Sequence, residues 1–403
     1  MRTFRVLVPV TRAVLGGSEL ALLRLIDACA EPGRDHTRLA ASDPLALAED
    51  RASVQSGAME FSAWLFSPGP LESEFARRGI RFERLPHHWL RAPWGPAALA
   101  ARLRATRPDA IYLHAGRAVA IAASQAKVPC IERMNMPRAD GAGGWCRFRA
   151  LDRALTNRND RVLAVSESLR DELVERGVLA HKIFVMRDPV DAERFHGARR
   201  PRSEESASFA DSPLGEQAPD ERLVLSIGRL TKQKGYDDLL RIAGACKEAL
   251  GRGDAPRTRA HRRIRFLIVG DGPLEQELSE QIRRRDLSEL VGMLPFQDDV
   301  APLYYAADVY LQTSRWEGLA AVLMEARASG LPIVATDVNG TREALRDYRA
   351  AQLYRPGDHH AAARAILDFL DDPVPPSPSV PEEFLPSRVA QLFTRVVSEV
   401  VRS

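Results

Sequence analysis

The chain has 403 residues, of which 45% are hydrophobic and 28% charged, so it can bury a sizeable core and is long enough for two domains. Four cysteines without a C-x-x-C spacing argue against a disulfide framework and a zinc site, and they indicate a reducing compartment. The early run VLVPV is too short for a signal-peptide core, and no stretch approaches about eighteen consecutive apolar residues. We therefore expect a cytoplasmic protein that does not span a membrane.

The charge is distributed unevenly. The net charge is +3, with +7 in residues 1–190 and −4 in the remainder. A basic first half suits peripheral contact with the anionic inner membrane surface or a phosphorylated acceptor, and a solvated arginine-rich surface explains it equally well. No basic stripe with interleaved aromatic residues stands out, so we do not expect nucleic acid as a partner.

In the first half, short apolar runs alternate with segments of helical period. The predicted strands are FRVLVPV, DAIYLH and RVLAVS, and the helices that follow them are ELALLRLIDACA, RAVAIAASQA and SLRDELVERG. Gly16 and Gly17 follow the first strand, before a helix that we expect Ser18 to cap. Such glycines allow a phosphate to approach free N–H groups, although a flexible turn is an equal alternative. His114 ends the second strand and suits either a ligand contact in a cleft or a structural role.

The second half repeats the alternation after an irregular segment, residues 197–220, which is rich in proline, serine and charge. Its predicted strands are RLVLSIG, RFLIVG, DVYLQTS and PIVATD. Strands alternating with helices predict two doubly wound α/β domains with parallel sheets, whose ligands lie at the carboxyl ends of the strands. The predicted organisation is an N-terminal domain (1–196), a linker or insertion (197–220), a C-terminal domain (221–372), and a proline-rich spacer with a final helix (373–403). A second insertion, residues 251–263, is expected to be an exposed basic loop.

Two turns of the second half carry candidate binding residues. Arg229 and Lys234 lie in GRLTKQKGYDDLL, at a strand-to-helix turn where phosphate binding is expected, although a solvated turn would also contain such charges. In IVGDGPLEQEL the glycine pair ending at Gly272 lacks the third glycine of a dinucleotide fingerprint, which argues against NAD. The pair Asp298–Asp299 lacks a D-x-D arrangement and fits the start of a helix better than a metal site.

Two carboxylates, Glu317 and Glu325, lie in the largely apolar segment WEGLAAVLMEARASG. We expect Glu317 in the turn after the strand DVYLQTS, Glu325 inside the following helix, and free amides at the helix start around Gly318, Leu319 and Ala320. The order of these groups along the segment is a carboxylate, then amides, then a second carboxylate. A nucleotide sugar has a matching order of sugar hydroxyls, diphosphate and ribose hydroxyls.

The run SRWEGLAAVLMEARASGLPIVATDVNGTREAL resembles the E-x7-E block of retaining glycosyltransferases of family four, which have the GT-B fold. LVLSIGRLTKQKG, FLIVGDGPLEQEL, AVSESLRDELVERGV, MRDPVDAERF and the GGSE loop extend the resemblance over nearly the whole chain. It implies two Rossmann-like domains that face each other across a cleft, with the C-terminal helix packed back on the N-terminal domain.

The resemblance also implies roles for individual residues. Arg229 and Lys234 would hold the donor diphosphate, Glu325 the ribose and Glu317 the donor sugar, with catalytic roles for Glu317, His114, Arg229 and Lys234. His114 would lie beside the donor sugar, Gly16 under the phosphates, and the segment from Leu294 to Phe296 around the base. The donor would be a UDP-, GDP- or ADP-sugar and the acceptor a saccharide or lipid-linked molecule of the cell envelope, such as lipopolysaccharide. The reaction would retain the anomeric configuration and need neither cofactor nor metal ion.

The sequence departs from the family pattern at Leu319–Ala321, which replace phenylalanine-glycine-leucine, and at MRDPVD, which replaces an asparagine-glycine turn. The first departure bears on sugar selectivity. A nucleotide-sugar 2-epimerase, a sugar phosphorylase and a non-catalytic nucleotide-sugar-binding module are the alternative functions on this fold. If Glu317 and Glu325 bind opposite ends of the donor, Glu317→Gln should leave diphosphate binding nearly unchanged.

Overall fold

A computed structural model describes residues 3–13, 16–30, 58–114, 116–135, 150–196, 221–252, 263–375 and 377–402. The contacts divide the chain into two compact units. The first unit comprises the described residues up to Val190 together with those from Pro381 onward, and the second comprises Asp191–Val380. The predicted insertion at 197–220 and most of the basic loop at 251–263 lie outside the described residues.

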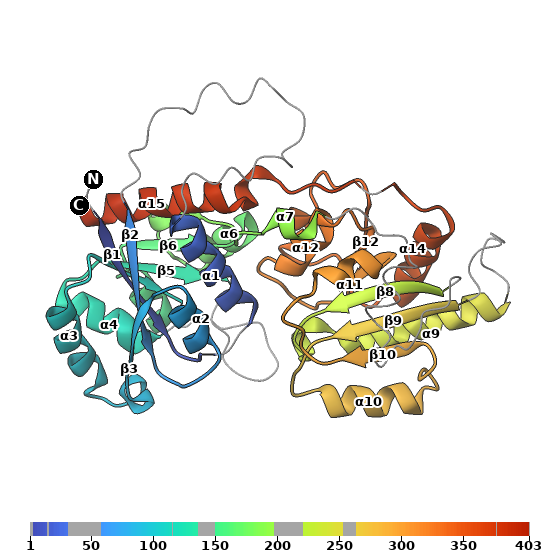
Figure 1. Cartoon of the computed structure of the whole chain (residues 1–403), viewed down its shortest axis with the longest axis horizontal. Helices are drawn as coiled ribbons and strands as arrows, with labels where there is room; N and C mark the ends of the chain where they lie inside the picture. The colour runs from blue at the N-terminus through green and yellow to red at the C-terminus, as the bar shows by residue number, and fades with distance from the viewer. Residues whose placement is uncertain are drawn as a thin grey trace, which may run out of the picture. The chain divides into compact units, whose positions relative to one another are not determined.

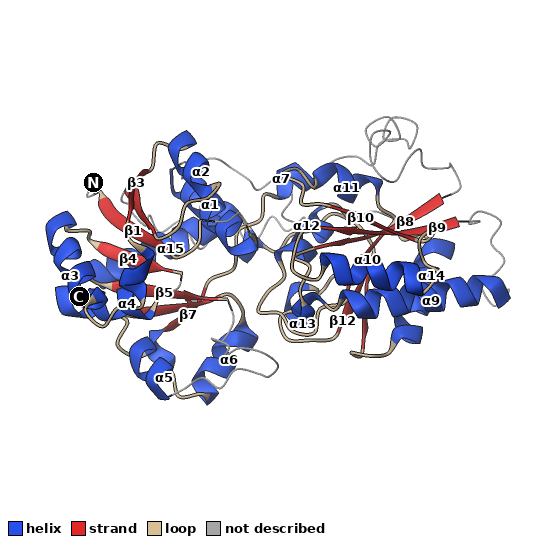
Figure 2. Ribbon diagram, turned by 90° about the horizontal axis from the view of Figure 1, so that it is seen from below, coloured by secondary structure: helices blue, strands red, loops and turns tan. Residues whose placement is uncertain are grey.

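Each unit contains one parallel sheet with helices on its faces (Figures 1 and 2). The strands of the first sheet are β1 (Phe4–Val10), β2 (Met59–Leu65), β3 (Arg81–Arg84), β4 (Ala110–Leu113), β5 (Cys130–Met134), β6 (Arg161–Ala164) and β7 (Ile183–Val185). Those of the second are β8 (Glu221–Ile227), β9 (Arg263–Val269), β10 (Val291–Leu294), β11 (Val309–Gln312), β12 (Ile333–Thr336) and β13 (Ala351–Tyr354). The strand orders are β3-β2-β1-β4-β5-β6-β7 and β10-β9-β8-β11-β12-β13. These are two Rossmann-like domains, as predicted.

The helices follow the strands in alternation. In the first unit they are α1 (Gly17–Ala30), α2 (Leu71–Arg77), α3 (Gly95–Thr106), α4 (Arg117–Ala126), α5 (Ala150–Thr156), α6 (Glu167–Glu175) and α15 (Pro386–Arg402). In the second they are α7 (Ala192–Phe195), α9 (Tyr236–Arg252), α10 (Glu275–Arg284), α11 (Ala301–Ala306), α12 (Ala321–Ala328), α13 (Thr341–Ala344) and α14 (His359–Asp371). Among these helices, none combines the length and apolarity that crossing a bilayer demands.

The C-terminal helix α15 packs on the sheet of the first unit (Figure 1). Its apolar stripe includes Phe393 and Val397, which lie in one buried cluster with Val6 of β1 and Leu22 of α1. Phe393 also makes an edge-on contact with Tyr112 of β4, with ring centroids 4.8 Å apart. The helix therefore completes the core of the N-terminal domain from the far end of the chain, which confirms the expected packing.

The start of α1 differs from the prediction. The helix begins at Gly17, and the carbonyl oxygen of Gly16 already accepts the N–H of Leu20 at 2.9 Å. Ser18 therefore lies inside the first turn and is not the N-cap. A Cβ on Gly16 would lie 3.0 Å from Oε2 of Glu19, so a larger residue would require only a shift of that flexible side chain.

Candidate active site

The candidate residues lie where the strand order of each sheet reverses. In the first sheet the adjacent strands β1 and β4 lead into Gly16 and His114. In the second, β8 leads into the loop that contains Arg229 and Lys234, and the adjacent β11 leads into Glu317. Loops that leave neighbouring strands in opposite directions at their carboxyl ends form the usual ligand crevice of open α/β sheets.

The loop after β8 packs directly on the end of β11. Gly235 has a φ of +63°, and a Cβ at this position would lie 2.2 Å from the carbonyl oxygen of Thr313. The hydroxyl of Thr313 donates to the carbonyl of Lys234 at 2.8 Å, and the Tyr236 hydroxyl donates to the carbonyl of Gly228 at 3.0 Å. Only glycine permits this close approach, which holds the backbone of Lys234 against the β11 loop.

Glu317 and Lys234, 83 positions apart in the sequence, form an ion pair with Nζ 2.5 Å from Oε1. The Glu317 side chain is only 6% exposed. Its Oε1 also accepts the hydroxyl of Ser314 at 2.7 Å and lies 3.5 Å from the amide nitrogen of Gln312, while Oε2 lies 3.4 Å from that of Gln233. The carboxylate is therefore fixed at the end of β11 by several donors.

Unpaired donors lie in the adjoining segments. The exposed side chain of Arg229 has no hydrogen-bonding partner in the described part of the chain. Gly318, Leu319 and Ala320 are buried residues just before α12, and within the described ranges their backbone N–H groups have no acceptor. Unpaired amides at a helix start and a free guanidinium are the groups that bind phosphate oxygens.

Glu325 lies inside α12, as predicted, and is 7% exposed. Oε2 accepts a hydrogen bond from the hydroxyl of Tyr304 at 3.2 Å. Burial, followed by the charge of Glu325, raises the pKa of Tyr304 well above its ordinary value, so this hydroxyl stays protonated and donates. The structure thus places Glu317 in the turn and Glu325 in the helix.

The loop after β9 approaches the loop after β8, and the loop after β10 contacts the loop after β9. A Cβ on Gly272 would lie 2.4 Å from the carbonyl oxygen of Leu230, which explains the glycine. Leu294 is buried at the end of β10, whereas Phe296 is 41% exposed and its N–H donates to Asp271 at 2.9 Å. An exposed aromatic ring beside a closely packed glycine turn suits a flat ligand group.

His114 in the first unit is partly exposed, but its Nε2 is buried and Arg133 lies near its ring. Its Nε2 is buried without a partner among the described residues, and its ring makes an edge-on contact with Tyr112 at 4.8 Å. Burial, and then the charge of Arg133, lower the pKa of His114 well below its ordinary value, so the ring is neutral at pH 7. Arg133 is itself buried and pairs with Asp188.

Asp299 serves a structural purpose. It accepts a hydrogen bond from Arg194 of α7 at 2.7 Å and one from the N–H of Ala301, at the start of α11, at 3.2 Å. Across the described ranges, no cluster of three or more histidine, cysteine or acidic side chains has the arrangement of a metal site.

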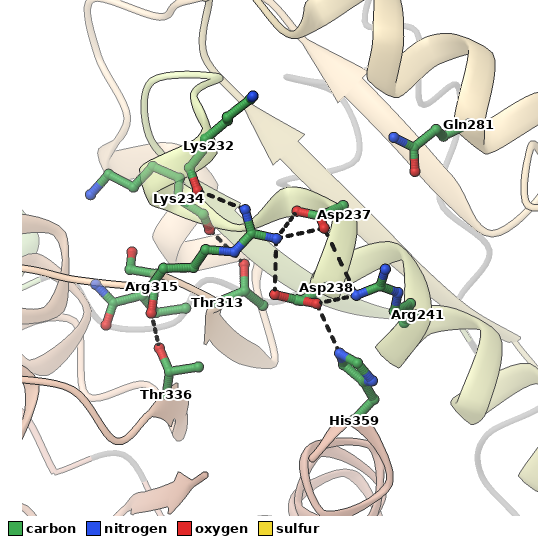
Figure 3. A network of polar contacts seen from close by, with 12 residues as sticks. Lys232, Lys234, Asp237, Asp238, Arg241, Gln281, Thr313, Arg315, Thr336 and His359 are labelled. Carbon is green, nitrogen blue, oxygen red and sulfur yellow. Dashed lines mark hydrogen bonds and ion pairs between the residues drawn. The ribbon is translucent and has the colours of Figure 1, made fainter. Parts of the chain in front are cut away.

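Several residues of the site carried no recognisable signal in the sequence. Ser314, Gln312 and Gln233 surround Glu317, and Arg315 joins the two loops: its Nη2 lies 2.6 Å from Oδ2 of Asp237 (Figure 3). Ordinary polar residues near a strand end become distinctive only when the partner loop is known.

Comparison with known proteins agrees with this architecture. The model of Glycosyltransferase Family 4 matches residues 15–194, and the model of Glycosyl transferases group 1 matches residues 212–383. The architecture is the GT-B fold. The chain therefore contains a family 4 domain and a group 1 domain, the two domain types of GT-B glycosyltransferases.

Relatives and solved structures point to the same class. A glycogen synthase of Mycobacterium tuberculosis is 28% identical over 67% of this chain, and the amylovoran biosynthesis glycosyltransferase AmsK of Erwinia amylovora is 26% identical over 68%. The matched segment spans 62% and 64% of these relatives. The crystal structure of Anabaena Alr3699/HepE in complex with UDP-glucose aligns with a TM-score of 0.70 at 20% identity, covering 99% of this chain and 97% of that one.

Proposed function

We propose that this protein is a retaining glycosyltransferase that moves a sugar from a nucleotide-sugar donor to a saccharide or lipid-linked acceptor. One observation carries the proposal. At the β8/β11 switch point, Lys234 lies 2.5 Å from the buried Glu317, next to segments that carry the Arg229 guanidinium and three backbone amides, all without partners in the described part of the chain. Cations and amides suit a diphosphate, and a carboxylate suits the hydroxyls of the attached sugar.

Breaking the bond between sugar and diphosphate leaves an additional negative charge on the leaving group. Arg229, Lys234 and the amides before α12 would stabilise that charge in place of a metal ion. Sugar transfer should therefore persist in EDTA. A strict requirement for Mg²⁺ or Mn²⁺ would contradict this assignment of the leaving-group site.

The remaining contacts follow the order of the donor. Glu325 would bind the ribose, and the Leu294–Phe296 segment would contact the base. Neutral His114, whose Nε2 has no partner among the described residues, would form a hydrogen bond with a sugar hydroxyl. No carboxylate needs to act as a covalent nucleophile, since attack from the front face with the donor phosphate as base retains the configuration. The proton NMR coupling of the anomeric hydrogen in the product tests retention.

We further propose a role in the synthesis of a cell-envelope polysaccharide or lipopolysaccharide at the cytoplasmic face of the membrane. Similarity to AmsK supports the polysaccharide class, and the HepE complex supports UDP-glucose as the first donor to test. A thermal-shift screen with UDP-, GDP- and ADP-glucose identifies the nucleobase of the donor. Purified protein with the selected donor and envelope extract should then release nucleoside diphosphate together with a glycosylated product.

The same assay separates the alternatives. Conversion of the donor to its 2-epimer would indicate an epimerase, and phosphate-dependent release of sugar phosphate would indicate a phosphorylase. Donor binding without turnover in any extract would indicate a binding module.

A further inference from the structure

Lys234, proposed to bind the diphosphate, and Glu317, proposed to bind the sugar, neutralise each other's charge when the donor site is empty. Nζ of Lys234 lies 2.5 Å from Oε1 of Glu317, and the two side chains are 18% and 6% exposed. The mutual attraction of two charges this far removed from water is stronger than that of an exposed pair, and removing one partner leaves a costly unpaired charge.

Glu317 is the fixed member of the pair. Ser314 and Gln312 approach the same carboxylate oxygen as Lys234, at 2.7 and 3.5 Å, and Gln233 approaches the other at 3.4 Å. Gln312 ends β11, Ser314 lies in the loop after it, and Gln233 lies in the loop after β8. The ammonium of Lys234, in contrast, ends a flexible four-carbon stem, so an incoming phosphate can draw it away while Glu317 stays in place.

The two natural ligands differ in what they offer Glu317. A free nucleoside diphosphate attracts Lys234 but brings a second anion toward the carboxylate. An intact nucleotide sugar attracts Lys234 equally and also supplies hydroxyl groups that donate hydrogen bonds to the carboxylate. On the basis of the function proposed above, we propose that the Lys234–Glu317 pair discriminates the intact donor from the free nucleoside diphosphate, and so weakens the binding of the product.

The pair reverses the expectation that follows from the sequence alone. If the two acids simply read different ends of the donor, Glu317→Gln leaves diphosphate binding unchanged. If Glu317 competes with the diphosphate for Lys234, Glu317→Gln tightens diphosphate binding. We expect a gain of about tenfold, equivalent to about 1.4 kcal/mol, and a simultaneous loss of affinity or turnover for the nucleotide sugar.

The test is titration calorimetry of the full chain with UDP, GDP and ADP, and with the glucose ester of whichever diphosphate binds. Glu325→Gln is the matched control, because it makes the same chemical change in the same segment. Since both ligands carry the ribose, this control should weaken diphosphate and nucleotide sugar alike. The double variant Lys234→Met/Glu317→Gln should lose the tenfold gain, because the gain acts through Lys234.

The outcomes are distinct. If wild-type protein binds none of the three diphosphates or their glucose esters, the proposed function fails. If it binds one and Glu317→Gln binds it no more tightly, with an unchanged melting temperature, the competition is disproved. A gain that persists in the double variant would also overturn the inference, since it would then come from the general loss of negative charge. If Glu317→Gln does not fold, Ser314→Ala, which loosens the carboxylate but keeps its charge, should lower the affinity ratio of nucleotide sugar to diphosphate. An unchanged ratio in that variant would overturn the inference.

Discussion

Arg315→Ala should separate the two loops of the donor site. Nη2 of Arg315 lies 2.6 and 2.8 Å from the carboxylate oxygens of Asp237 at the start of α9, and Nη1 donates to the carbonyl of Lys232 at 3.2 Å (Figure 3). Arg315 belongs to the loop that carries Glu317, and Lys232 to the loop that carries Lys234. The side chain therefore clamps the backbone of one ligand-bearing loop to the other.

The contacts set the size of the effect. Hydrogen bonds to charged groups contribute about 1.5–3 kcal/mol, but exposed ion pairs contribute only about 0–1 kcal/mol. Arg315 and Asp237 are 37% and 29% exposed, so their bonds fall between these limits. We expect a loss of about 1–2 kcal/mol of stability, or about 3–6 °C in the melting temperature of a unit of this size. Displacing reacting groups by about 1 Å can cost about a hundredfold in rate, so kcat/KM should fall about ten- to a hundredfold.

Arg241→Ala provides the matched control. Arg241 is 46% exposed, donates to Asp238 at 2.7 Å and lies 3.9 Å from Asp237, and among the described residues it has no partner in the Glu317 loop. This variant should show the same or a smaller change in melting temperature with activity unchanged. Arg315→Lys keeps the charge and should restore part of the activity. Wild-type kcat/KM in Arg315→Ala, or an equal loss in Arg241→Ala, would refute the clamp.

Three further perturbations test the rest of the assignment. Arg229→Ala should lower kcat/KM by about two to three orders of magnitude, since removing one preorganised donor to a developing charge costs about 2.7–4 kcal/mol; steady-state rates at the wild-type level would contradict the diphosphate role. Glu325→Gln should weaken the binding of UDP and of UDP-glucose by the same amount, about 1.5–3 kcal/mol. If calorimetry shows weaker binding of only one of the two ligands, Glu325 does not bind the ribose. Because the pKa of His114 is lower in the folded than in the unfolded chain, its contribution to stability is present above pH ~6.5 and declines as the pH falls below it. Urea titrations of His114→Phe should accordingly show a flatter pH dependence between about pH 7 and 5, and an unchanged slope would show that the folded state does not hold this ring neutral.

The sequence alone was sufficient where the local pattern is strong. Apolar strands such as β1, β8 and β9 are buried along most of their length, so their composition identifies them. The strand DVYLQTS and the helical pattern after it correctly placed Glu317 in a turn and Glu325 in a helix. Six strands were not predicted, namely β2, β3, β5, β7, β10 and β13. In β3 and β13 charged or exposed residues dominate an edge strand, and in β5 Glu132 and Arg133 are buried, so no apolar run appears.

Tertiary structure decided which of the candidate residues meet. The order β10-β9-β8-β11-β12-β13 makes β8 and β11 neighbours, so their loops adjoin although the chain inserts two strands between them. Only this adjacency brings Lys234 against Glu317 and sets Arg315 across both loops. Spacing along the chain predicts two carboxylates with separate roles. Only the tertiary structure pairs one of them, Glu317, with Lys234, and this pair is the basis of the proposed competition with the diphosphate.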